Sequence, residues 1–561
     1  MIAWRQRAWV AVFCLLVVQP AAARYDVVIS GGVVFDGSGA APRVADVAVT
    51  GDRIAAIGQL ADAVAAQRID ATGLAIAPGF INVLSWADEA LIADGRSQGN
   101  IRQGVTLEVF GEGRSRGPLN DAMRAEALTK QDYGAYPIAW TSLDEFLRWL
   151  VDRGVSANVA SFVGATTVRV HALGYADRAP DATELARMQA LVRQAMEDGA
   201  LGVGSSLIYA PGAYAATDEL VALARAAAAY GGTYSTHLRS EAGGVLDAVD
   251  EFLHIVRSTG INGHVHHLKV AGREHWQLLP AVLARLETAR DAGLPVTANM
   301  YTYTAGATGF DAAMPPWVQA GGDAAWFERL TNPEVRARVL AEMRAAPDGW
   351  DNLLRAAGAE GTLLTGFRNE ALRPLIGQSL AAVARARGVS PEEAVLDLVV
   401  EDRSEVDVVY FFMDEANVAR KLRVPWITFG SDARSMTAGG VFLSHSTHPR
   451  AYGNFARLLG RYVRDEGLLT LQEAVRRLTS LPAEILGIQG RGALRPGYHA
   501  DIAVFDPELI QDQATYADPH RYAIGMRHVL VNGTPVLLDG THTGALPGRV
   551  VRGPGWRGRR R

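Results

Sequence analysis

Two histidines lie where a parallel barrel could hold a metal ion. His237 and His267 each end a run of small or β-branched residues that predicts a strand, and the segment 243–257 between them has the apolar spacing of an amphipathic helix. In a (β/α) barrel, side chains at the C-terminal ends of neighbouring strands meet on one face. Neutral imidazole is the commonest side-chain ligand of zinc-type ions. A lone histidine is more often a core or surface residue, but this paired arrangement predicts a shared metal site.

In the middle of the chain, predicted strands alternate with predicted helices, as such a barrel requires. An apolar run at 74–82 opens it, and helical patterns separate the later strand candidates. The span 306–374 interrupts this alternation, because it is rich in Ala, Pro and Gly with short helices. It therefore predicts an inserted lid or subdomain. The strand candidates are 105–109, 157–163, 202–205, 232–235, 263–268, 295–300, 408–412 and 426–429.

The two ends of the chain differ from the middle. Short runs of alternating apolar and polar residues, separated by Gly turns, occupy 25–57, and the same pattern occurs again at 496–533. Chain termini of one domain usually lie close together. We therefore predict an α/β fold, a (β/α)8 TIM barrel at 76–490 with a small β-sandwich built from 24–75 and 491–553.

The first 23 residues have the pattern of a secretory signal. Two arginines precede an apolar stretch at 8–18, and three alanines at 21–23 offer a small-residue cleavage site. The stretch is too short to span a bilayer comfortably, so we expect no membrane span once it is removed. Cys14 is the only cysteine, which leaves the mature chain without thiolate ligands. We predict a signal peptide at 1–23 and an exported protein, periplasmic or secreted.

The overall charge gives no reason to expect a nucleic-acid partner. The 561 residues carry a net charge of −5, and the sequence pI is near 6.3. The basic C-terminal segment 554–561 is short, and we interpret it as a solvated tail.

Six short motifs occur in a defined order along the chain. They are Pro78-Gly79-Phe80-Ile81-Asn82, Gly104-Val105-Thr106, Thr236-His237-Leu238-Arg239-Ser240-Glu241, His267-Leu268-Lys269, Gly430-Ser431-Asp432 and His448-Pro449-Arg450. In this order and spacing they resemble the amidohydrolase superfamily, and within it the D-aminoacylase (N-acyl-D-amino-acid deacylase) family. The resemblance covers 25–553. It implies a barrel enzyme that hydrolyses the amide bond of small N-acyl-D-amino acids, giving a carboxylic acid and a D-amino acid.

The chain departs from this family at two places. Amidohydrolases usually carry a His-x-His pair just after the Pro-Gly-Phe-Ile strand, but here Leu84 and Trp86 stand there and Asn82 precedes them. Apolar side chains cannot hold a metal ion, so the first of two possible metal positions is expected to be lost. D-aminoacylases also place a cysteine ligand after the Gly-Val-Thr strand. Here Glu112 lies on that loop and resembles a carboxylate replacement; otherwise it is a solvated loop residue.

The resemblance implies a single metal ion and one catalytic carboxylate. Glu112, His237 and His267 would hold one Zn²⁺, with other divalent transition metals as alternatives, and a fourth position would remain for water. Asp432 matches the position of the family's catalytic aspartate, which takes a proton from water and returns it to the departing nitrogen. The other reading of Asp432 is a helix N-cap, and the two roles do not exclude each other.

The resemblance also implies a subsite for the substrate's α-carboxylate. Lys269, Tyr301 and Arg450 match the residues that form it, and arginine can bind a carboxylate bidentately. The other reading of Arg450 is a structural arginine on a Pro-containing loop. His264, His266, His445 and His448 are interpreted as loop or core residues.

Two other functions fit the same sequence. The barrel could hydrolyse a different amide, such as a cyclic imide or a dipeptide. Because Leu84 and Trp86 replace two expected ligands, it could also be a catalytically silent barrel that binds a ligand. The joint presence of His237, His267 and Asp432 on three separate strands favours an enzyme.

Overall fold

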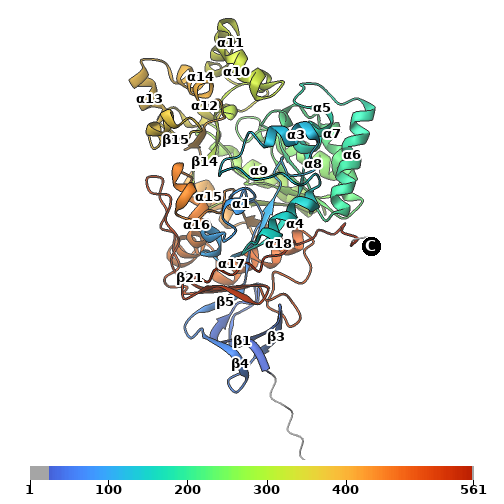
Figure 1. Ribbon diagram of the computed structural model, residues 1–561, viewed down its shortest axis with the longest axis vertical. Coiled ribbons are helices and arrows are strands. Elements are labelled where there is room, and N and C mark those ends of the chain that lie inside the picture. The colour runs from blue at the N-terminus through green and yellow to red at the C-terminus, as the bar shows by residue number, and fades with distance from the viewer. Residues whose placement is uncertain (1–23, 559–561) are drawn as a thin grey trace, which may run out of the picture.

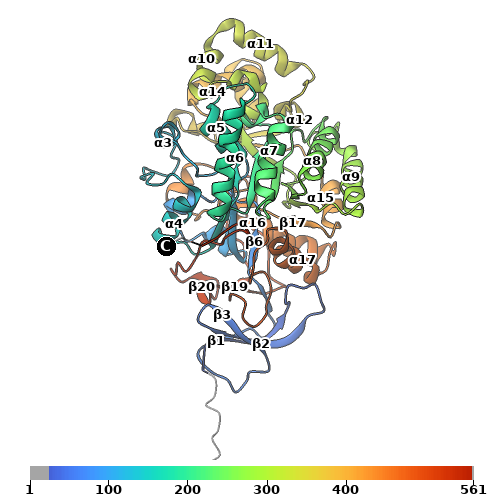
Figure 2. The same cartoon turned by 90° about the vertical axis from the view of Figure 1, so that its right-hand side faces the viewer.

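The computed structural model describes residues 24–558, so the predicted signal peptide at 1–23 and the last three residues of the tail lie outside it. Figures 1 and 2 show three parts along the long axis: a β-sheet from both ends of the chain, a barrel in the middle, and an inserted segment at the opposite end. Among residues 24–558, no helix has both the length and the apolar character needed to cross a membrane.

The barrel has eight parallel strands when β8 and β9 are taken as one interrupted strand. Neighbouring strands pair in the order β6-β7-β8 and β9-β10-β11-β12-β13-β17. A parallel bridge between Ser85 and Ala433 joins the two ends and closes the barrel. The strands are β6 (Phe80–Asn82), β7 (Val105–Phe110), β8 (Asn158–Ser161), β9 (Val163–Gly164), β10 (Gly202–Ser206), β11 (Thr233–His237), β12 (Asn262–Val265), β13 (Val296–Met300) and β17 (Ile427–Phe429).

Amphipathic helices follow the strands and cover the barrel (Figure 2). In α8, seven apolar residues face the core, as the sequence spacing predicts. The helices are α1 (Ala90–Ala93), α2 (Gln98–Ile101), α3 (Asp121–Ala127), α4 (Leu143–Arg153), α5 (Ala165–Leu173), α6 (Ala182–Glu197), α7 (Thr217–Ala228), α8 (Val245–Thr259), α9 (Leu279–Asp291), α15 (Glu415–Leu422), α16 (Arg450–Arg457), α17 (Leu471–Leu478) and α18 (Ser480–Ile485).

Both ends of the chain contribute to one nine-stranded sheet. Its order is β21-β20-β19-β18-β5-β1-β2-β3, with β4 paired to β1, so strands from the two termini meet where β18 pairs with β5. The strands are β1 (Arg24–Val34), β2 (Arg43–Thr50), β3 (Arg53–Gly58), β4 (Val64–Asp70), β5 (Ala75–Pro78), β18 (Ile502–Phe505), β19 (Met526–Val531), β20 (Thr534–Leu538) and β21 (Thr541–His542).

The inserted segment is longer than the predicted 306–374, and one strand assignment was wrong. The run at 408–412 was predicted as a barrel strand, but it forms β16, which pairs antiparallel with β14 and β15 in a separate sheet. Barrel strand β13 pairs directly with β17. The insert contains β14 (Gly306–Gly309), α10 (Asp323–Thr331), α11 (Pro333–Arg344), α12 (Leu353–Ala357), β15 (Thr362–Gly366), α13 (Leu380–Arg387), α14 (Pro391–Asp402) and β16 (Asp407–Tyr410).

Candidate active site

Three barrel strands bring Glu112, His237 and His267 to one buried point. Glu112 follows β7, His237 ends β11, and His267 lies two residues beyond β12. Glu112 Oε1 is 3.2 Å from His237 Nδ1 and 2.9 Å from His267 Nε2. Donors bound to one tetrahedral zinc ion at about 2.0–2.2 Å would be roughly 3.3 Å apart. The three side chains therefore fit the donor types and spacing of a zinc-type site.

The loop that carries Glu112 depends on two glycines. Gly111 and Gly113 have φ angles of 101° and 68°, in the region that favours glycine. A Cβ at Gly111 would lie 2.4 Å from the carbonyl oxygen of Phe162, and one at Gly113 would lie 2.5 Å from the Cβ of Ser206. The backbone can therefore pack directly against the next two strands, which fixes the position of Glu112.

His267 lies on a tight turn and not on the strand that the sequence predicts. The predicted strand at 263–268 ends at Val265, and His267 has a φ of 33°. Asn299 of β13 holds the turn, because its Oδ1 accepts from His267 N at 2.7 Å and its carbonyl accepts from Leu268 N at 2.8 Å. Buried Lys421 also donates to the Leu268 carbonyl, at 2.6 Å. These contacts turn the imidazole toward Glu112.

Glu241 contacts both histidines and received no role from the sequence. Its Oε1 lies 3.0 Å from His267 Nδ1, and its Oε2 lies 3.3 Å from His237 Nε2. These are the ring nitrogens that point away from Glu112. Carboxylates in this position orient metal-binding imidazoles and raise their basicity. The sequence signal was its place in the Thr236–Glu241 motif, four residues after His237.

The charges around the two histidines suit a cation. Burial acts to raise the pKa of Glu112, but His267 and His237 outweigh it and lower that pKa well below its usual range. Burial and Lys269 act to lower the pKa of His267, but Glu112 and Glu241 raise it to about 9. The carboxylates of Glu112 and Glu241 therefore stabilise positive charge at this point, which a metal ion bound by neutral imidazoles could supply.

Replacing Glu241 with glutamine is expected to weaken metal binding by about 10- to 100-fold, because the imidazoles lose a charged partner. Competition with a chromophoric chelator measures the affinity. Glu251→Gln is the matched control. Glu251 pairs at 2.8 Å with Arg239, which lies on the loop that carries Glu241, and residues 24–558 show no hydrogen bond or ion pair between Glu251 and either histidine. Equal affinities for the two variants would contradict a role for Glu241 at the metal site.

The three predicted carboxylate-binding residues meet beside the histidines. The Arg450 guanidinium carbon lies 4.5 Å from the centre of the Tyr301 ring, and Lys269 Nζ lies 5.9 Å from it. The Lys269 ammonium is already paired with Glu241 Oε1 at 2.6 Å and lies 2.7 Å from His267 Nδ1. Arg450 is 3% exposed, and its Nε and Nη1 have no aligned hydrogen-bond acceptor among the described residues.

Asp432 lies beyond β17 and faces Arg450. It has a φ of 49°, and its Oδ2 is 2.9 Å from Arg450 Nη1. Its Oδ1 accepts from Trp86 Nε1 at 3.1 Å, a contact that the sequence did not indicate. The alternative reading of Asp432 as a helix N-cap is wrong, because the next helix begins only at Gly440.

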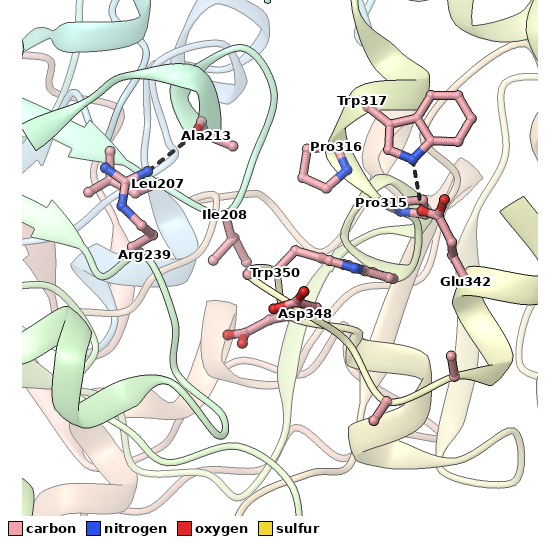
Figure 3. A pocket seen from close by; sticks show the side chains of 14 residues that line it. Leu207, Ile208, Ala213, Arg239, Pro315, Pro316, Trp317, Glu342, Asp348 and Trp350 are labelled. Atoms are coloured by element: carbon pink, nitrogen blue, oxygen red, sulfur yellow. Dashed lines mark hydrogen bonds between the residues drawn. The ribbon is translucent and has the colours of Figure 1, made fainter.

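A cavity lies between the insert and the loops that follow β10 and β11 (Figure 3). Its volume is about 410 Å³, and Ile208, Pro316 and Trp350 are among the side chains that line it. Glu112, His237 and His267 do not line this cavity, but Leu207 in its wall donates through its backbone N to the His237 carbonyl at 3.3 Å. The neighbouring Tyr209 ring lies 5.4 Å from the His237 ring.

The insert is also tied to the loop that carries Glu241. Asp351 of the insert accepts hydrogen bonds from Glu241 N at 2.6 Å and from Ser240 Oγ at 2.7 Å. Asp351 is buried, and it lines the cavity beside Trp350. The position of the insert therefore bears directly on the carboxylate that orients both histidines.

Comparison with known proteins places the chain in a family. A model of the amidohydrolase family matches residues 67–537. The chain is 34% identical to a D-aminoacylase of Alcaligenes xylosoxydans xylosoxydans over 535 residues, which cover 94% of this chain and 97% of that protein. It is 33% identical over 529 residues to an N-acyl-D-glutamate deacylase of the same organism, again covering 94% and 97%.

Solved structures agree with this placement. A crystal structure of D-aminoacylase matches with a TM-score of 0.79 and 33% identity, covering 94% of this chain and all of that one. The N-acyl-D-glutamate deacylase of Bordetella bronchiseptica, in complex with zinc and a phosphonate inhibitor, matches with a TM-score of 0.78 and 32% identity over 94% of this chain and all of that one. The chain therefore belongs to the amidohydrolase family, among the D-aminoacylases and N-acyl-D-amino-acid deacylases.

Proposed function

We propose that the protein is a metal-dependent hydrolase that cleaves N-acyl-D-amino acids into a carboxylic acid and a D-amino acid. The observation that carries the proposal is the buried guanidinium of Arg450. Its Nε has no hydrogen-bond acceptor among the described residues, its Nη1 is paired with Asp432, and the guanidinium covers the Tyr301 ring. An unpaired buried donor is costly, and a substrate carboxylate could bind Nε together with Nη2, the nitrogen on the same edge of the guanidinium.

One Zn²⁺ per chain, held by Glu112, His237 and His267, is the metal state that we propose. Two imidazoles and a carboxylate form a donor set of catalytic zinc sites, with one position left open. Leu84 is buried and has no atom that can bind a metal ion. The indole nitrogen of Trp86 can donate a hydrogen bond but cannot act as a metal ligand. A bound zinc ion supplies Lewis acidity to the amide carbonyl and to a water molecule.

The protein's own groups would handle the substrate and the proton. Arg450 would bind the α-carboxylate, with Tyr301 beside it. Asp432 would take a proton from the attacking water and return it to the nitrogen that leaves as the C–N bond breaks. The ammonium of Lys269 would act mainly through Glu241, since that carboxylate already holds it at 2.6 Å. This differs from the sequence expectation, in which Lys269 binds the substrate directly.

We also propose that the cavity beside His237 takes the apolar part of the substrate. Its volume of about 410 Å³ lies within the range of small-molecule sites. The walls contain Trp317 and Trp350 from the insert and Ile208 from the barrel (Figure 3). The carboxylate end of the substrate would face Arg450, which does not line the cavity.

Arg450→Gln is expected to lower kcat/KM on N-acetyl-D-amino acids by about 10- to 150-fold, mainly through KM, because a charge-assisted bond contributes roughly 1.5–3 kcal/mol. Steady-state kinetics on substrates with a free and with an amide-capped carboxylate measure the effect, which should largely vanish for the capped ones. Arg457→Gln is the matched control, since Arg457 lies at the other end of α16, over Tyr303. Equal losses of kcat/KM on capped and free substrates would show that Arg450 does not bind the substrate carboxylate.

The proposed function is tested by comparing N-acetyl-D- and N-acetyl-L-amino acids as substrates of the zinc-loaded protein. We expect hydrolysis of the D-enantiomers, its loss after chelation, and its return when zinc is added back. Equal rates on both enantiomers, or activity that survives complete metal removal, would reject the proposal. A cyclic imide and a dipeptide are assayed in parallel, because they are substrates of the competing readings.

A further inference from the structure

Trp86 is bonded to the carboxylate that we assign as the catalytic base. Its indole Nε1–H donates to Asp432 Oδ1 at 3.1 Å, while Arg450 Nη1 lies 2.9 Å from Oδ2. The two carboxylate oxygens therefore have different partners. The Trp86 residue is 37% exposed, so burial of its ring is a poor explanation for an indole at this place.

The backbone fixes Trp86 and Asp432 relative to each other. Trp86 N donates to the Ala433 carbonyl at 3.0 Å, and Asp432 N donates to the Leu84 carbonyl at 2.9 Å. These two bonds flank the bridge that closes the barrel between Ser85 and Ala433. The contact between indole and carboxylate is therefore built into barrel closure and does not need a substrate to form.

Arg450 cannot hold Asp432 in the same way throughout the reaction. In the proposed function, the substrate carboxylate binds Nε and Nη2 and competes with Oδ2 for the charge of the same guanidinium, which weakens the hold of Nη1 on Oδ2. A carboxylate with one remaining partner keeps its orientation only if that partner stays. Trp86 carries no charge for the substrate carboxylate to attract, so its bond to Oδ1 persists.

We propose that Trp86 is a positioning residue for Asp432, which keeps Oδ1 occupied and leaves Oδ2 as the oxygen that accepts the proton. This inference rests on the proposed hydrolase function. In the step concerned, a water O–H bond breaks, its proton passes to Oδ2, and the water oxygen bonds to the amide carbonyl carbon. The same proton then passes from Oδ2 to the nitrogen as the C–N bond breaks.

Two substitutions distinguish the effect of the indole N–H from the effect of the indole ring. Trp86→Phe removes the donor and keeps an aromatic ring, and we expect kcat to fall by about 10- to 100-fold with KM and bound metal unchanged. Trp86→Gln loses the ring, but its amide N–H lies as many bonds from Cβ as the indole N–H of Trp86 does. This variant should therefore recover most of the kcat that Trp86→Phe loses. In an Asp432→Asn background, Trp86→Phe should cause no further loss, because both changes act on one group.

A second readout does not depend on activity. In ¹⁵N-labelled protein, the indole resonance of Trp86 is identified by its disappearance in Trp86→Phe, and we expect it to shift in Asp432→Ala. An unshifted resonance, a Trp86→Phe variant as fast as wild type, or a Trp86→Gln variant slower than Trp86→Phe would each overturn the inference. A wild-type protein without hydrolytic activity would instead reject the proposed function, and the resonance would still show whether the contact exists.

Discussion

Glu112→Ala is expected to release the metal ion and abolish hydrolysis. The substitution removes one of three donors and the only anionic one, and it leaves His237 and His267 without the carboxylate that lies between them. Loss of a partner that merely orients a ligand costs about 10- to 100-fold in metal affinity, so loss of a ligand itself should cost more. Metal content after dialysis, zinc titration and the rate on N-acetyl-D-amino acids measure the effect.

Glu112→Gln is the matched control for this prediction. It keeps the shape and an oxygen donor but removes the charge, so we expect metal affinity and activity between those of wild type and Glu112→Ala. Circular dichroism checks that each variant folds. A Glu112→Ala protein that keeps both metal and rate would show that Glu112 is not a ligand, and two stoichiometric ions in the native protein would contradict a single-metal site.

The meeting of His237 and His267 was predictable because its signal is local. His237 and His267 each follow a strand of small or β-branched residues, and a barrel places such strand ends together. Glu112 could be found only through the resemblance, since one carboxylate between two glycines is common in surface loops. The structure explains the arrangement, because Gly111 and Gly113 are needed for close packing against the next strands.

The partners of the site residues could not be predicted from the sequence. Glu241 lies beyond the end of β11, where no periodicity indicates the direction of a side chain. Lys269 was placed on the same strand as His267, but β12 ends at Val265 and the turn at His267 brings its ammonium to Glu241. The contact between Trp86 and Asp432 joins residues 346 positions apart, and it depends on how the barrel closes.

One strand was assigned to the wrong sheet for a physical reason. Buried barrel strands and the central strand of the insert are both covered on their two faces, so both read as short apolar runs. The run at 408–412 therefore has the same appearance as β17, although it pairs antiparallel with β14 and β15. Only the pairing partners distinguish the two, and no local pattern encodes them.

Asp432→Asn is expected to lower kcat by about 10²–10⁴-fold while the protein keeps its fold and its metal ion. Asparagine preserves the size of the side chain and an oxygen that can accept from Trp86, but its amide cannot take a proton from water. Steady-state kinetics on N-acetyl-D-amino acids, together with metal analysis of the same preparation, measure the effect.

The same variant makes a second prediction, about KM. With its oxygen toward Trp86, the asparagine places its NH₂ group against Arg450 Nη1, where the wild-type carboxylate lies at 2.9 Å. Arg450 then loses its competing anion and is free to bind the substrate carboxylate, so KM should not rise although kcat falls. A base that was needed only for structure would show the opposite pattern, with a near-normal kcat. That result would return Asp432 to a structural role and leave proton transfer to another group.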